Sequence, residues 1–251
     1  YAGTNGGMFL STNNGNSWSL VNNGLTSSTI FSMAVLGTNV FAGTAGGGVF
    51  MTNNNGGNWI PVNSGLTNTV IHAMVSKGTD VFVDNGSAGI YRSSDSGTTW
   101  LPANSGLPGA MHSMAVSGNN IIAGSWSAGV YISFDNGDTW SPANTGLSNM
   151  FVNSVASVGA DLFAGLNGGG VFISINNGGH RTPVNSGLSH KRIHCFGSCG
   201  STFYTGTIDG LFSTTNSGAS WILKGVPTVS TVSIAASGTT VYAGSFGSVF
   251  F

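Results

Sequence analysis

Three histidines, His72, His112 and His194, are the residues whose type and spacing best suit ligand chemistry. His112 follows His72 by 40 residues, and His194 follows His112 by 82, about twice that interval. Imidazole nitrogens coordinate Zn, Cu or Ni, and they also donate and accept hydrogen bonds. The spacing equally fits histidines that pack between repeated elements with one satisfied hydrogen bond each. Metal binding, ligand contact and packing therefore all stay open.

Carboxylates and one tryptophan extend this candidate set. Asp84 and Asp209 lie outside the repeated motifs described below, and a glycosidase would need such a pair of acids. Trp126 stands beside Ser125 and Ser127, and an aromatic ring beside small polar groups can stack on a sugar while they bond its hydroxyls. Trp126 could equally cover a neighbouring loop, which is the alternative reading of its position.

A repeat of about 41 residues must position these side chains. Tryptophans recur at positions 18, 59, 100, 140 and 221, and Arg181 stands where a sixth would fall. Each repeat holds four short runs rich in β-branched and aromatic residues, separated by Gly, Asn and Ser. Such a period is typical of propeller blades. We expect an all-β chain, with almost no helix, that folds as one β-propeller domain of four-stranded antiparallel blades over residues 1–251.

The two ends of the chain share one pattern, since Tyr1–Phe9 reappears as Tyr242–Phe250. This overlap favours six blades, in which the strand at Trp18 completes the C-terminal blade. Seven blades, with the two end blades each lacking a strand, are the alternative. The chain begins within the pattern, as an excised piece of a larger chain or assembly would.

An eight-residue motif, S/T-x-D/N-x-G-x-x-W, precedes each tryptophan, in full as Ser93–Trp100 and Ser133–Trp140. It resembles the Asp-box, or BNR, repeat of sialidases, sortilin-type receptors and secreted bacterial propellers. The resemblance implies that the boxes are structural turns on the face opposite the ligand, with Asp or Asn accepting local backbone hydrogen bonds.

A sialidase-like site is not expected, because the chain has no Glu and its arginines are few: Arg92, Arg181 and Arg192. We therefore predict a protein that is not an enzyme and has no metal or other cofactor.

The ligand is expected where the innermost strands begin and where the second strands end. The first position aligns Phe31, His72, His112, Asn153, His194 and Val232 in one column. The turns after the second strands vary most between repeats, which often marks recognition loops. The predicted ligand-binding residues are Trp126, His72, His112, His194, Asn85, Asp84, Asn153, Asn167 and Asp209.

Composition narrows the partners. Charged residues make up 5% of the chain and the net charge is −1, which argues against nucleic acid. No apolar stretch is long enough for a membrane span. Cys195 and Cys199 are predicted to be free thiols. We expect a secreted or cell-surface, lectin-like propeller that binds a glycan. The alternative is a structural or protein–protein interaction module of a larger secreted or cell-surface protein, with a cell-surface protein as its partner.

Overall fold

The computed structural model describes residues 1–225, 229–246 and 248–250, and it consists mainly of short β-strands. Within these residues the one helix is a single 3₁₀ turn, η1 (Gly86–Ala88), which confirms the expected scarcity of helix. None of the described residues form a helix long and apolar enough to cross a membrane. The chain divides into two compact units, which are described separately: residues 1–111 with 137–140, and residues 112–136 with 141–251.

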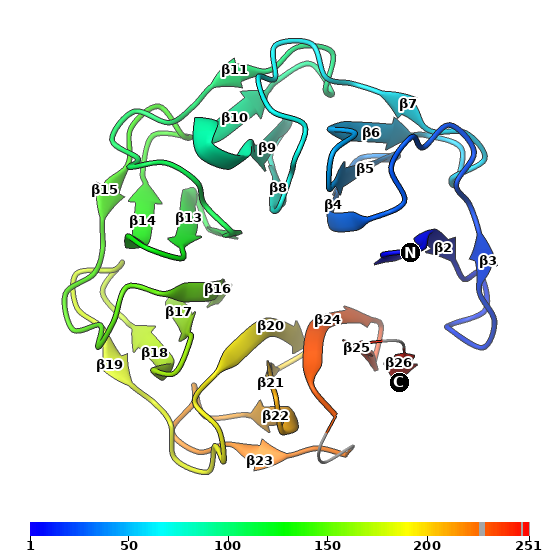
Figure 1. Ribbon diagram of the computed structural model, residues 1–251. Helices are drawn as coiled ribbons and strands as arrows, with labels where there is room; N and C mark the ends of the chain where they lie inside the picture. The colour runs from blue at the N-terminus through cyan, green and yellow to red at the C-terminus, as the bar shows by residue number, and fades with distance from the viewer. Residues whose placement is uncertain (226–228, 247, 251) are drawn as a thin grey trace. The chain divides into compact units, whose positions relative to one another are not determined.

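The first unit holds three antiparallel sheets whose strands pair in sequence order (Figure 1). They are β1 (Ala2–Thr4), β2 (Gly7–Leu10) and β3 (Ser19–Leu20); β4 (Ile30–Leu36), β5 (Asn39–Thr44), β6 (Val49–Thr52) and β7 (Ile60–Pro61); and β8 (Met74–Lys77), β9 (Asp80–Asp84), β10 (Ile90–Ser93) and β11 (Leu101–Pro102).

The second unit holds four sheets of the same design in its described residues. They are β12 (Ser113–Ser117), β13 (Asn120–Ser125), β14 (Gly129–Ser133) and β15 (Ser141–Pro142); β16 (Val152–Val158), β17 (Asp161–Leu166), β18 (Gly170–Ser174) and β19 (Thr182–Pro183); β20 (Ile193–Cys199), β21 (Thr202–Thr207), β22 (Gly210–Thr214) and β23 (Ile222–Leu223); and β24 (Thr231–Ser237), β25 (Thr240–Ser245) and β26 (Ser248–Phe250).

Seven sheets in the described residues show that the expectation of six blades is wrong. The strand after Trp18, β3, pairs with β2 in the N-terminal sheet, and both terminal sheets have three strands. A partner in the adjacent hairpin closes a shorter loop than one at the other end of the chain, so it costs less entropy. The arrangement is the seven-blade alternative. Gly247, within the repeated C-terminal pattern, lies outside the described residues.

The middle strands of the sheets supply the core. Every residue of β9 and of β18 is buried, because successive sheets within a unit pack face to face and cover both surfaces of these strands. Their continuous Val, Ile and Phe content is what two-sided burial requires. Cys195 and Cys199 lie on one strand, β20, and both are free thiols, as predicted.

The regular spacing of the tryptophans reflects one hydrogen bond that recurs between successive repeats. The indole Nε1 of Trp59 donates to the carbonyl of Val21 at 2.8 Å, and that of Trp100 donates to Val62 at 2.7 Å. Arg181 makes the same link, since its Nε donates to the carbonyl of Ala143 at 3.0 Å. Each link joins the end of one sheet to the next repeat.

The motif before each tryptophan forms a hydrogen-bonded turn. Oδ1 of Asp95 accepts from the Ser93 hydroxyl at 2.8 Å and from the Thr99 backbone N–H at 2.9 Å, and Oδ2 accepts from the Thr99 hydroxyl at 2.6 Å. Ser96 and Gly97 follow with φ of 59° and 86°, a left-handed pair that explains the glycine. The carboxylate of Asp95 therefore stabilises the turn.

Candidate functional site

The predicted column of Phe31, His72, His112, Asn153, His194 and Val232 coincides with an irregularity in the first strands. In four sheets the register with the second strand shifts across the column residue, which is left out of the ladder: Phe31, Asn153, His194 and Val232. A bulge of this kind redirects a side chain and is common beside functional sites. His72 and His112 precede strands that begin only at Met74 and Ser113.

Trp126 and His112 form an aromatic pair in the second unit. Their rings are parallel within 11° and their centroids are 3.6 Å apart, and Trp126 is 50% exposed. Trp126 lies in the turn between β13 and β14, while the backbone N–H of His112 donates to Gly124 at the end of β13. The imidazole therefore supports one face of an indole that still presents half of its surface to solvent.

His72 and Asp84 form a polar pair in the first unit. His72 Nδ1 lies 3.3 Å from Oδ2 of Asp84, and its ring stacks on Phe31 at a centroid distance of 5.3 Å. Oδ1 of Asp84 accepts from the backbone N–H of Met111 at 3.0 Å. The carboxylate is completely buried, so its role is to orient His72 and to anchor the chain at Met111.

Asp84 departs from the repeat in a way that sequence reasoning missed. The register pairs it with Ile90, just as Gly43 pairs with Val49 and Gly124 with Val130. The other sheets thus place glycine at this point, because a Cβ on Gly43 would meet Ile71, in the segment that leads into β8, at 2.6 Å. Aligning the repeats at this column, rather than at the tryptophans alone, would have revealed the exception.

Two predicted asparagines have structural contacts. Asn85 is fully buried, and its Nδ2 donates to the Thr67 hydroxyl at 3.2 Å. Asn153 donates through Nδ2 to the carbonyl of Ile193, in the next sheet, at 2.8 Å. Each bond uses an amide N–H that was expected to reach a ligand, and ligand contact by either residue stays a prediction.

The remaining predicted residues gather in the second unit around the loop that leads into β20. Asn167 accepts at Oδ1 from Arg192 Nε at 2.8 Å, and Asp209 accepts at Oδ2 from the Ser189 hydroxyl at 2.6 Å. His194 Nδ1 lies 3.2 Å from the Ser230 hydroxyl. Arg192 is not among the ligand-binding residues that the sequence predicts. A signal was present, since four of the chain's eleven Lys, Arg and His residues fall within Ser189–His194.

The turns after second strands and the loops that lead into first strands lie together in this unit. Gly129 N–H donates to the carbonyl of Met150, and Gly170 N–H donates to that of Lys191. We call this set of segments the loop rim: residues 126–128, 149–151, 167–169 and 189–192. Trp126 and Arg192 are both members of it, and Met150 and Phe151, also on the rim, are exposed.

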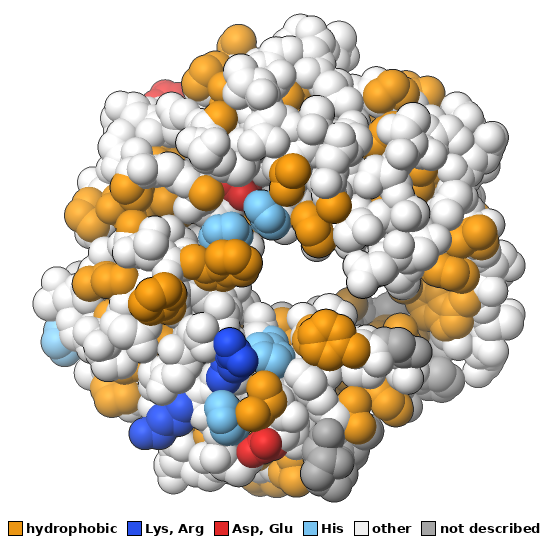
Figure 2. All heavy atoms as spheres, in the orientation of Figure 1, with side chains coloured by type: hydrophobic (Ala, Val, Ile, Leu, Met, Phe, Trp, Pro, Cys, Tyr) orange, Lys and Arg blue, Asp and Glu red, His pale blue; other side chains and the backbone are white. Residues whose placement is uncertain are grey.

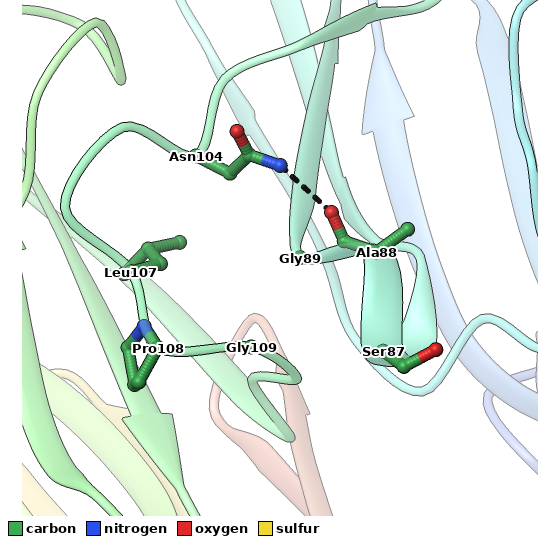
Figure 3. Close-up of a pocket in the computed structure, with 7 residues that line it drawn as sticks. All are labelled: Ser87, Ala88, Gly89, Asn104, Leu107, Pro108 and Gly109. Carbon is green, nitrogen blue, oxygen red and sulfur yellow. Dashed lines mark hydrogen bonds between the residues drawn. The ribbon is translucent and has the colours of Figure 1, made fainter.

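A small cavity in the first unit does not coincide with these residues. It measures about 230 Å³ and is lined by Ser87, Ala88, Gly89, Asn104, Leu107, Pro108 and Gly109 (Figure 3). Asn104 Nδ2 donates across it to the carbonyl of Ala88 at 2.7 Å. The volume is below the usual range of small-molecule sites, so an exposed surface suits a ligand better than this cavity does.

Comparison with known proteins identifies the fold. No family model and no curated protein matches the chain. Among solved structures, YCF48 bound to a D1 peptide is 18% identical with a TM-score of 0.76, covering 96% of this chain and 84% of that one.

Two further solved structures are longer proteins. The extracellular domain of BT4673 from B. thetaiotaomicron is 16% identical with a TM-score of 0.75, and 90% of this chain matches 32% of that one. A GH74 xyloglucanase from Xanthomonas campestris is 15% identical with a TM-score of 0.65, and 90% of this chain matches 40% of it. These likenesses show a β-propeller fold built from four-stranded antiparallel blades.

Proposed function

We propose that the chain is a non-catalytic, carbohydrate-binding propeller of the Asp-box class, acting as a secreted or cell-surface module. The observation that carries this proposal is the half-exposed indole of Trp126, stacked on His112 at 3.6 Å. A ring already held by a second ring loses little conformational freedom when a sugar packs on it, so more of the contact energy appears as affinity.

The surroundings of Trp126 suit a hydroxyl-rich partner. Ser127 and Asn149 on the loop rim offer hydrogen-bonding groups, and Phe151 offers a second ring that is 55% exposed. The scarcity of charge in the chain agrees with recognition by stacking and hydrogen bonds. One fold neighbour is a xyloglucanase, which acts on a polysaccharide.

Replacing Trp126 by Ala tests the proposal. We expect affinity for the glycan identified on an array to fall by about tenfold or more, as for other central aromatic contacts. The change in the free energy of unfolding should stay below about 2 kcal/mol, because only half of the side chain is buried.

Phe134→Ala is the matched control, since Phe134 is 56% exposed but lies in a motif turn at the other end of β14. It should leave glycan binding unchanged. Absence of any glycan signal for the unaltered protein would contradict the proposal.

Peptide recognition is the second candidate. It is favoured by the fold neighbour YCF48, whose structure holds a D1 peptide. A peptide array run with the same Trp126→Ala and Phe134→Ala pair distinguishes the two, because a peptide ligand would give the signal that the glycan array lacks.

A further inference from the structure

The loop that leads into β20 is fixed by side chains from two different turns. Ser189 is bound to Asp209, in the turn between β21 and β22 of the same sheet. Arg192 is bound to Asn167, in the turn after β17 of the preceding sheet, through its Nε and through a backbone bridge. The loop is therefore ordered at both ends before any ligand arrives.

This order leaves a set of hydrogen-bond donors facing outward. Arg192 is exposed and uses Nε for Asn167, and among the described residues its Nη1 and Nη2 have no acceptor. Lys191, which precedes Arg192 in the loop, is exposed as well. His190 Nδ1 accepts from the Arg192 backbone N–H at 3.0 Å, so a neutral His190 carries its proton on Nε2 and donates from there.

The donors also create a local positive field in a chain with little charge. The Lys and Arg side chains visible on one face of the molecule gather at the loop between β19 and β20 (Figure 2). The pKa of His194 is lowered, mainly by burial and further by the charges of Arg192 and His190. One carboxylate, Asp209, is joined to this loop, against the two cations Lys191 and Arg192.

Hydrogen bonds along the loop rim connect this loop to the turn that carries Trp126. Asn167 N–H donates to the carbonyl of Phe151, and the N–H of Gly129, which follows the turn that carries Trp126, donates to the carbonyl of Met150. The segment with the exposed side chains of Met150 and Phe151 thus lies between the turn that carries Trp126 and the turn whose Asn167 binds Arg192. A linear ligand that stacks on Trp126 can continue over Phe151 towards a charged end.

We propose that the loop Ser189–Arg192 binds the carboxylate of an acidic saccharide, so that the ligand class is a hexuronate-containing glycan. The inference rests on the proposed function and names its ligand more closely. A carboxylate matches the terminal edge of a guanidinium whose Nε is already occupied, and Lys191 and His190 add donors beside it. No covalent chemistry is involved.

Binding of oligogalacturonate, compared with its methyl ester, tests the proposal. The two ligands share a sugar backbone, but the ester has no charge. We expect the acid to bind roughly tenfold more tightly than the ester, in line with charge-assisted hydrogen bonds, with a preference that weakens as salt is added. Arg192→Gln should remove the preference, so that the affinity for the acid falls to that for the ester.

Lys224→Gln is the matched control, because Lys224 is an exposed cation of the same unit outside the loop rim. It should keep the preference for the acid. A thermal unfolding curve checks each variant, and Lys191→Gln, expected to halve the preference or more, replaces Arg192→Gln if that variant unfolds.

The outcomes separate the two proposals. Equal binding of acid and ester, both weakened by Trp126→Ala, would overturn the acidic ligand and leave the carbohydrate function standing. Binding of neither would overturn the carbohydrate function together with the inference. If Arg192→Gln and Lys224→Gln lost the preference for the acid equally, the attraction would be unspecific. Displacement of oligogalacturonate by an equimolar acidic peptide would identify a protein ligand. Either result overturns the inference.

Discussion

At the scale of single residues, Arg181 shows how one position of the repeat tolerates a different chemistry. It is 1% exposed, its Nε replaces the tryptophan hydrogen bond, and its Nη1 donates to the carbonyl of Leu162 at 3.4 Å. Nη2 has no partner among the described residues. Burial lowers the pKa of the guanidinium to about 10, which reflects the cost of keeping a charge there.

Restoring the repeat at this position should stabilise the protein. Arg181→Trp keeps the donor to Ala143 and removes a buried charge, so we expect the free energy of unfolding to rise by about 1–2 kcal/mol in urea titrations. Arg181→Leu removes the charge and the donor together, and it should be less stable than Arg181→Trp. Earlier unfolding of Arg181→Trp than of the unaltered protein would refute the expectation.

The carboxyl group of Asp95 makes the stability of the folded state depend on pH. Hydrogen bonds from the Thr99 hydroxyl, the Thr99 backbone and the Ser93 hydroxyl lower the pKa of this carboxyl to about 2. The folded state thus favours the carboxylate, and this stability is complete above the unfolded value of about 4 and is lost as pH falls through about 2.

Asp95→Asn is the reference for measuring that dependence, because asparagine fills the same place in other motif turns, as at Asn54. The unfolding free energy of the unaltered protein minus that of the variant should fall between pH 4 and pH 2 and stay constant above pH 5. A difference that does not change across the acid range would show that the carboxylate contributes nothing to the turn.

At the scale of elements, one glycine position sets how closely sheets approach within a unit. This glycine column is the position equivalent to Asp84, and Gly43 and Gly124 occupy it. A Cβ on Gly43 would lie 2.5 Å from the Ser32 hydroxyl and 2.6 Å from a methyl group of Ile71, in a region with no room to expand. Gly43→Ala should therefore cost about 1–3 kcal/mol in denaturant unfolding, as overpacked cores do.

Gly46→Ala is the control, because nothing lies within 4 Å of a Cβ at Gly46, three residues further on. It should change stability by less than about 0.5 kcal/mol. If the two variants were equally stable, the column would not be limiting the approach of the sheets.

The strands and turns could be predicted where the same residue type has the same structural role in each repeat. The tryptophan period predicts the four-stranded blades, and Asp95 with Gly97 predicts a turn, because both features recur in nearly every repeat. The role of Asp84 could not be predicted from its local sequence, since it depends on Met111, which lies far along the chain but is adjacent in space. The stacking of Trp126 on His112 depends in the same way on a register set by the whole sheet.

At the scale of the whole molecule, the number of blades was the feature that the sequence left open. The repeated segment at both ends has the same length in either arrangement, so counting repeats does not decide which strands pair. The pairing of β3 with β2 decides it. The proposed binding surface also depends on long-range pairing, because residues of three successive repeats, around Trp126, Phe151 and Arg192, meet on the loop rim of one unit.

The proline residues of the outer strands bear on how this protein behaves when concentrated. Fourth strands contain a proline at positions 61, 102, 142 and 183, which removes a backbone donor from a sheet edge. Proteins of ordinary composition also repel one another through surface charge, but here 5% of residues are charged. Protection against edge-to-edge association therefore falls mainly to these prolines, and edge strands without one, such as β3 at Leu20 and β23 at Leu223, are places where crowded molecules would join sheets.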